Sequence, residues 1–409
     1  MLVLPVILGV VFLTWYWWKP HPRSPPTVPG ALPIIGHTLE LIKHRNDLWR
    51  YMERIVDSVL ENKQLVQLRL DPHILYVATD PEEVRIIANT CLDKPYFYNF
   101  LVDGIGNGLI TADGAMWKIH RKLINPAFNQ LVLNTFLPEM NAQARNLISQ
   151  LTAMAGKGPV DVKECLNKYI LRTVCTSVGL DAKDQDMIDR EYAKTIDEYA
   201  KIICSRGYNV GLHPSLIYNW TTLRSKELKV VEDIKNIINP IIRKRRFDLS
   251  ETNFAEHGKF KPMLDLLLHL SDEQHVLSDD DIRQHLDTFV IASFETTSSV
   301  LQIMLFVLGS YPDVQERVYK EIFGLFRIQE VFKGNAELTK QDMSKLIYLE
   351  AVLKEVMRLY NVIPWIGRKL GADVVLHAVN MRPSPSPFVG TRCESVQTGA
   401  MAESCHFTQ

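Results

Sequence analysis

The stretch of sequence that decides the fold is residues 286–308, LDTFVIASFETTSSVLQIMLFVL. It is long and apolar enough to form a helix in the core of a large domain. Its middle nevertheless carries one carboxylate and several hydroxyls, at Ser293, Glu295, Thr296, Thr297, Ser298 and Ser299. Such groups are costly in a core unless they are paired or used. Two interpretations stay open: the hydroxyls bond back to the preceding turn with Glu295 on an exposed face, or these residues form a polar notch at an active site.

Composition indicates a globular chain with a sizeable core. The 409 residues are 46% hydrophobic and 23% charged, with a formal net charge of −1, and one large domain fits them as well as two or three. The balanced charge gives no support for nucleic-acid binding. The six cysteines are scattered, without a CxxC or a Cys/His zinc spacing. We therefore expect reduced thiols and no metal site of that kind.

The N-terminus predicts a membrane anchor. Residues 1–18, MLVLPVILGVVFLTWYWW, carry no charge and end in aromatic residues, and the basic residues Lys19 and Arg23 follow. This order favours an uncleaved anchor with an aromatic belt and with the body of the protein on the cytoplasmic side. The alternative is a buried terminal helix of a soluble protein. Residues 19–36 contain six prolines and predict an extended linker.

The rest of the chain predicts a mainly α fold with a small β-rich corner. Residues 65–78 have the composition of two short strands around a turn at Asp71-Pro72. Apolar spacing predicts helices over residues 47–62, 113–125, 141–153, 162–177, 184–204, 226–246, 278–310, 313–323 and 348–360. Residues 97–109 and 205–218 lack that spacing and predict loops, the second of them mobile, and residues 247–261 predict a polar linker.

Two helical pairs carry side chains that can act together. Trp117 and Arg121 are four residues apart and share one helix face. They are either a Trp stacked on an Arg stem, or two donors aimed at one anionic group of a ligand. Glu355 and Arg358 are three apart, which by itself is a common surface pair. The basic run at residues 243–246 is interpreted as a solvated helix end rather than a nucleic-acid patch.

Three fragments together resemble one family. WKIHR at Trp117–Arg121, ASFETT at Ala292–Thr297 and KEVMR at Lys354–Arg358 are similar to the WxxxR, the (A/G)Gx(D/E)TT and the ExxR of the cytochromes P-450. The surrounding sequence resembles the fatty-acid-hydroxylase-like microsomal branch of insects and vertebrates. The resemblance covers about residues 1–377. It implies a monooxygenase that hydroxylates a small apolar substrate (fatty acid, hormone or xenobiotic) with haem, dioxygen and electrons from NADPH-cytochrome reductase, at the endoplasmic reticulum membrane.

The resemblance also assigns binding and structural roles. Trp117, Arg121 and Arg368 would bind the haem propionates, since an indole N–H and guanidinium groups are charge-assisted donors to carboxylates. Glu355 and Arg358 would form a buried structural pair near the haem-proximal core. A buried pair of this kind is costly to break by removing one member.

In the long helix the resemblance assigns the chemistry to Glu295 and Thr296. This acid–alcohol pair would pass protons at a buried site, with Thr296 bonding back along the helix to open a groove for dioxygen. Ser293 stands where the family usually has Gly, which narrows that groove. Ala292 stands where one branch ties its haem through a Glu, so no ester link is expected. The substrate would lie over the helix near Ile291, facing residues 97–109.

The family's iron ligand is a Cys in an FxxGxRxCxG turn, and no such turn follows Arg358. The closest imitation is FVGTRC, ending at Cys393, whose intervals are too short for that turn, so it is interpreted as coincidence. Residues 378–409 contain no Leu, Ile, Tyr or Trp, and we expect an unrelated, disordered tail. Residues 37–377 are accordingly interpreted as an incomplete catalytic domain, truncated before the Cys loop. The alternative function is a non-catalytic product without the axial thiolate.

Overall fold

The structure is a computed structural model of the whole chain. It describes Gly9 and Phe12 and residues 25–44, 47–62, 65–70, 73–180, 191–251, 262–325, 337–372, 374–376, 380–381 and 387–391. The predicted anchor (residues 1–18), most of the polar linker at residues 247–261, and Cys393 therefore lie outside the described residues, apart from a few positions.

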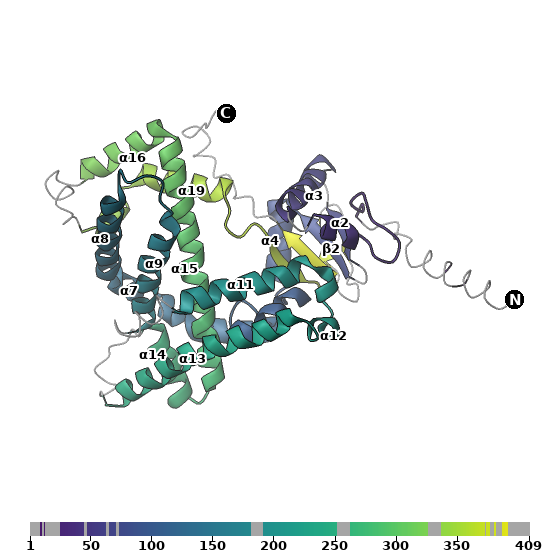
Figure 1. Cartoon of the computed structure of the whole chain (residues 1–409), viewed down its shortest axis with the longest axis horizontal. Coiled ribbons are helices and arrows are strands. Elements are labelled where there is room, and N and C mark those ends of the chain that lie inside the picture. Colours follow the sequence, from purple (N-terminus) through teal and green to yellow (C-terminus); the bar gives the residue numbers. More distant parts are fainter. Residues whose placement is uncertain are drawn as a thin grey trace.

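Helices dominate the described chain, as the sequence predicts, and a small sheet forms one corner (Figure 1). The longer helices are α3 (Leu48–Asn62), α4 (Pro81–Thr90), α6 (Gly114–Ile124), α8 (Leu137–Met154), α9 (Val162–Val178), α11 (Ala193–Tyr208), α13 (Thr222–Glu251), α14 (Met263–Asp272), α15 (Asp279–Ser310), α16 (Pro312–Leu325) and α19 (Ile347–Leu359). The short ones are α2 (Thr38–Lys43), η1 (Tyr96–Leu101), α5 (Val102–Ile105), η2 (Asn125–Phe128), α7 (Gln130–Thr135), η4 (Val210–Leu212), α12 (Ser215–Tyr218) and α18 (Lys340–Met343).

Helix α15 is the element on which the others are assembled. It begins at a capping box in which Ser278 and Asp281 bond each other's backbone N–H, with three acids in its first turn. Along its length it contacts α9, α13, α14, α16 and α19, which surround it in Figure 1. Its buried face, including Leu286 and Val290, joins one large core with Ile234 of α13 and Leu264 of α14.

Among the described residues, α15 is also the one helix long and apolar enough to cross a membrane. A core helix of a soluble domain passes the same test, because both are long and apolar. In the structure α15 packs against α9, α13 and α14, and 28% of its apolar stretch is buried.

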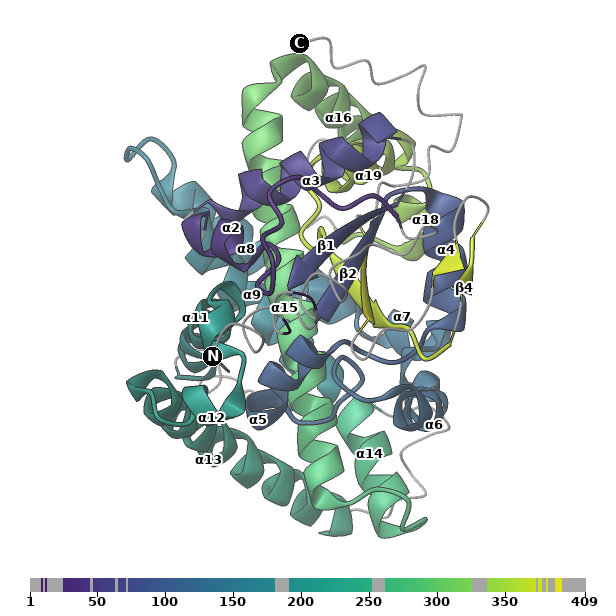
Figure 2. The ribbon, with the colours of Figure 1, turned by 90° about the vertical axis from the view of Figure 1, so that its right-hand side faces the viewer.

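The β-rich corner is a four-stranded sheet in the order β1-β2-β6-β3. Strands β1 (Val66–Leu70) and β2 (His73–Ala78) form the predicted hairpin. Strand β6 (Pro387–Thr391) pairs parallel to β2 and antiparallel to β3 (Ile366–Lys369), and β4 (Val374–Val375) pairs with β5 (Asn380–Met381) in a second sheet. Figure 2 shows the sheet lying in front of α15.

Strands β5 and β6 correct the expectation that residues 378–409 have no regular structure. In β6 the backbone groups pair with strands on both sides, and those partners come from distant parts of the chain. Local periodicity does not report such tertiary pairing, so β6 could not be predicted from the residues of the tail alone. The remaining residues of the tail lie outside the described part of the chain.

Two further expectations were wrong. Residues 97–109 and 205–218, predicted as loops, contain η1, α5, η4, α12 and the end of α11. The basic run at residues 243–246 does not end a helix, because α13 continues to Glu251. Arg245 forms a bidentate ion pair with buried Asp265, with both hydrogen bonds at 2.8 Å, and Arg246 pairs with Asp279. Two of these basic residues therefore form ion pairs that join α13 to α14 and α15.

Candidate functional site

Helix α6 carries the first pair of predicted site residues. Its N-terminus is fixed by Asp113, whose carboxylate accepts a hydrogen bond from Met116 N at 2.9 Å. Trp117 is half-buried, whereas Arg121 is exposed and lies 5.9 Å from the centroid of the Phe128 ring. Within the described chain neither side chain donates a hydrogen bond to a protein acceptor, so both donors stay available on one face of the helix.

Asp93, which the sequence analysis did not single out, joins the two parts of the predicted propionate site. Its carboxylate accepts from Gly114 N, at the start of α6, at 2.9 Å. Its backbone carbonyl accepts from Lys369 N, at the end of β3, at 2.9 Å. One residue therefore holds the strand that carries Arg368 beside the start of the helix that carries Trp117 and Arg121.

Arg368 is half-buried and only partly satisfied. One Nη donates to the Gly367 carbonyl at 2.8 Å, while its Nε is buried without a hydrogen-bond partner among the described residues. Lys94 lies close to Arg368. Burial is the main cause that lowers the pKa of Lys94 to about 8, and the positive charge of the Arg368 guanidinium is the second. Two cations and an unsatisfied donor at one place suit an anionic group. The residues present therefore fit the carboxylate end of a haem.

Three of the hydroxyls in the middle of α15, those of Ser293, Thr296 and Ser299, bond back along the helix, as the first interpretation expected, whereas Ser298 Oγ is buried without a partner among the described residues. Thr296 donates to the Ala292 carbonyl at 2.8 Å, and Ser293 donates to the Phe289 carbonyl at 2.7 Å. Glu295 turns away from Thr296, and its side chain, 45% exposed, accepts from Lys163 Nζ at the start of α9 at 3.3 Å. The predicted acid–alcohol pair thus shares a helix turn without a direct hydrogen bond between its members.

The pairing of Glu355 with Arg358 is as expected, but its burial is not. Two parallel hydrogen bonds of 2.8 and 2.7 Å join the groups, and the guanidinium lowers the pKa of Glu355. The Arg358 side chain is 40% exposed and that of Glu355 is 15% exposed. Helix α19 turns this face outward in the described structure, so the buried pair expected from the resemblance is half-exposed.

The described cysteines differ in their exposure. Cys91, Cys165 and Cys175 are buried, Cys91 and Cys175 of them within apolar clusters, and Cys204 is exposed on α11. The part of the chain that the structure describes contains no group of three or more metal-ligating side chains. Cys393, weighed in the sequence analysis, lies outside that part.

The segment 97–109 packs on the first half of α15, where the substrate is expected. Asn107 N donates to the Gln284 side chain at 2.6 Å, and the buried Arg283 reaches the Gly104 carbonyl at 3.5 Å. Gly108 lies so close to Thr288 that a side chain there would collide with the helix. Ile291, about one turn beyond Thr288 along α15, is half-buried and continues this surface.

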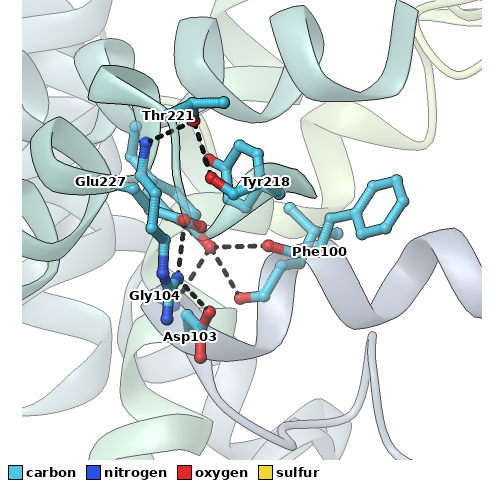
Figure 3. Close-up of polar contacts among 9 residues, drawn as sticks. Phe100, Asp103, Gly104, Tyr218, Thr221 and Glu227 are labelled. Carbon is cyan, nitrogen blue, oxygen red and sulfur yellow. Dashed lines mark hydrogen bonds and ion pairs between the residues drawn. The ribbon is translucent and has the colours of Figure 1, made fainter. Parts of the chain in front are cut away.

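Buried polar contacts missed by sequence reasoning hold that segment from the other side. Tyr199 of α11 accepts a hydrogen bond from Gly104 N at 3.0 Å and donates to the Leu101 carbonyl at 2.9 Å. Arg224 of α13 bridges Asp103 at 2.5 Å and the fully buried Glu227 at 2.7 Å (Figure 3). The contacts of Tyr199 and Arg224 with residues 97–109 give no sequence signal, because these partners are separated by 95 to 121 positions along the chain.

A third buried network fixes α15 to Tyr192, the residue directly before α11. Asp287 accepts from the Arg283 guanidinium at 2.8 Å and from the Tyr192 hydroxyl at 3.0 Å. Burial raises the pKa of Asp287 to about 7, and the guanidinium and the hydroxyl oppose that rise. The carboxylate is fully buried, so it is a structural group that depends on both partners.

A mostly apolar cavity of about 490 Å³ lies between α8, α9 and α15. Ser293 and Thr297 are its polar contacts from α15, and Phe289 and Leu301 line it from the same helix. The cavity therefore borders the polar middle of the long helix.

Comparison with known proteins agrees with these features. The sequence model described as "Cytochrome P450" matches residues 25–382. Cytochrome P450 4c21 of Blattella germanica is 29% identical, over 85% of this chain and 71% of the relative. Human Cytochrome P450 4V2 is 28% identical over 91% of this chain and 72% of the relative, and Drosophila melanogaster Cytochrome P450 4c3 is 28% identical over 85% and 67%.

The match covers most of the chain and includes the three fragments on which the resemblance rests. It confirms the predicted family, the mainly α fold and the haem cofactor, and it does not favour the alternative of a non-catalytic product. The chain belongs to the cytochrome P450 family, the haem-dependent monooxygenases that act on apolar substrates.

Proposed function

We propose that this chain is itself a monooxygenase that hydroxylates an apolar substrate next to α15. The observation that carries the proposal is the cationic end of the site. Asp93 links β3 to α6, and Arg368 there has a buried Nε without a partner among the described residues. A haem whose propionates take up these donors would supply the activation of dioxygen.

Trp117, Arg121 and Arg368 are the residues we assign to the propionates. An indole N–H and two guanidinium groups can each donate to a carboxylate, and hydrogen bonds between charged groups are about twice as strong as neutral ones. Helix α6 supplies two of these donors and β3 supplies the third. Their convergence depends on Asp93, which bonds both elements.

Glu295 and Thr296 are the residues we assign to proton handling. The Thr296 hydroxyl proton is held by the Ala292 carbonyl, which weakens the backbone hydrogen bonding of α15 at that turn. The Glu295 carboxylate is held by Lys163 Nζ. Release of Glu295 from Lys163 would let it exchange a proton with solvent and deliver it towards the Thr296 Oγ1, which is general acid work.

The substrate would lie on α15 near Ile291 and Ala292, beneath residues 97–109, with Val362 and Ile363 across from them. The contacts of Tyr199 with Gly104 and of Arg224 with Asp103 hold residues 97–109 in place, which supports this position for the substrate. We further propose that the protein is anchored in the endoplasmic reticulum membrane by residues 1–18, with its body on the cytoplasmic side. NADPH-cytochrome reductase would dock on a basic face.

The test is the carbon-monoxide difference spectrum of reduced membranes that contain residues 1–409. A strongly red-shifted Soret band is expected if a thiolate of this chain reaches the iron, and C393S then tests the one cysteine in an imitation of the family turn. The double variant R121M/R368M should lower haem content. The absence of a band, or an unshifted band, would overturn the proposal for this chain.

A further inference from the structure

Arg206 is a buried cation that has no acidic partner among the described residues. It lies in the last turn of α11 and is 6% exposed. The hydrogen bonds and ion pairs of the described chain do not include its guanidinium, and its Nε is buried without a partner there. A buried charge is costly unless an opposite charge or hydrogen bonds compensate it. The guanidinium therefore lacks an acceptor that a bound molecule could supply.

Two aromatic rings hold this guanidinium. Its Cζ lies 4.1 Å from the centroid of the Phe100 ring in η1 and 3.8 Å from that of the Tyr218 ring in α12. Such contacts stabilise a positive charge and are made by the face of the guanidinium. Its N–H groups lie in its plane, so stacking leaves that edge unused. A carboxylate can accept two parallel hydrogen bonds from such an edge.

The acids of the neighbouring network bind a different arginine. Asp103 and the fully buried Glu227 both pair with Arg224 of α13 (Figure 3). One guanidinium thus receives two carboxylates, while Arg206, stacked on Tyr218 of the same network, receives none within the described chain. This distribution leaves Arg206 as the group in this region that can bind an additional anion.

The surroundings of Arg206 are apolar on the side of the main core. Ile202, one turn earlier on α11, and Ile105 belong to that core, and Leu101 packs against it. Phe100 and Leu101 also belong to residues 97–109, which pack on the first half of α15. A molecule whose charged end contacts Arg206 would therefore place an apolar body along this segment, towards α15.

We propose that Arg206 is a specificity-determining residue, which binds the carboxylate of an elongated apolar substrate with the edge of its guanidinium. The rings of Phe100 and Tyr218 would fix the orientation of that edge. This inference rests on the proposed function, because it takes residues 97–109 to cover the substrate. It selects, among apolar substrates, those that carry an acidic group at one end.

The test is calorimetric titration of the full chain, without haem, in lipid nanodiscs, with the heat measured for empty nanodiscs subtracted. The probes are decanoate and decan-1-ol, which share the alkyl chain and differ in charge. The variants are R206M, R206K and the control R243M, which removes an exposed arginine of α13.

Wild type and R243M should bind decanoate at least about tenfold more tightly than decan-1-ol, the effect of hydrogen bonds to a charged group. R206M should lose this preference and bind decan-1-ol as wild type does. R206K should keep only part of the preference, because an ammonium group retains the charge without the planar fork.

An undiminished preference for decanoate in R206M, or an equal loss of affinity for the acid and the alcohol, would overturn the role of Arg206. Should R206M fail to fold, as judged by circular dichroism, an undiminished preference in R206K would overturn edge-on recognition. Wild type that binds decanoate no better than decan-1-ol would overturn the inference alone. The titration uses no haem, so the carbon-monoxide spectrum tests the proposed function separately.

Discussion

The buried His120–His285 pair predicts a loss of stability in mild acid. His285 of α15 is 2% exposed, and its Nε2 lies 2.9 Å from Nδ1 of His120 on α6. At that distance one nitrogen donates and the other accepts, so the two rings cannot both be protonated at these nitrogens. Burial, and then the proximity of His120, lower the pKa of His285 from 6.5 to about 4, and Asp281 opposes the shift.

The sign and size of the effect follow from proton linkage. In the unfolded chain His285 takes up a proton below about pH 6.5, whereas in the folded protein it does so only near pH 4. The unfolded state therefore binds more protons in that window, and the free energy of unfolding falls as the pH falls. For these two pKa values the loss between pH 7 and pH 5 is about 2 kcal/mol.

The assay is urea unfolding of wild type, H285Q and the control H275N at pH 7 and pH 5, followed by tryptophan fluorescence in detergent. His275 is exposed, and its φ of 53° is one that Asn tolerates. Between pH 7 and pH 5, the free energy of unfolding of wild type and of H275N should fall by about 2 kcal/mol more than that of H285Q. Equal losses in wild type and H285Q would refute the reasoning, because another group would then be responsible for the acid sensitivity.

Three substitutions test the packing around α15 and the segment above it. Tyr199→Phe should lower the free energy of unfolding in urea by about 1–3 kcal/mol, because it leaves the buried Gly104 N–H unsatisfied. It should also speed proteolysis within residues 97–109, and unchanged proteolysis would contradict the role of Tyr199 in holding that segment. Gly108→Ala should cost about 1–3 kcal/mol and lower Tm, because its new Cβ would lie 2.7 Å from the Gln284 carbonyl oxygen; a neutral effect would show that the segment shifts freely. Ile234→Ala should cost about 2–5 kcal/mol in the same assay, since the side chain is fully buried in the main core, and a loss below 1 kcal/mol would place it outside the cooperative unit.

Local signals in the sequence were sufficient for most helices. The cap at Ser278 and the acids that follow it locate the start of α15, and Asp113 does the same for α6. The spacing of Trp117 and Arg121, like that of Glu355 and Arg358, places each pair on one helix face. These features depend on residues within a turn or two of one another, so they can be read from the chain alone.

Residues whose role depends on a distant partner could not be identified from local patterns. Lys163 holds Glu295 from another helix, and the partners of Tyr199 lie about a hundred positions away. The expectation of a buried Glu355–Arg358 pair was only partly right, because exposure is set by what covers α19 and not by the spacing of the two residues.

The sequence by itself determined the helical architecture and the family, and it predicts which residues face the cofactor, because each rests on short motifs and local periodicity. Only the tertiary structure decided that Asp93 joins α6 to β3, that Lys94 and Arg368 share one cationic site, and that β6 lies between β2 and β3. The physical reason is that hydrogen bonds and charge interactions act over a few ångströms in space, whereas these partners are separated by tens to hundreds of residues along the chain.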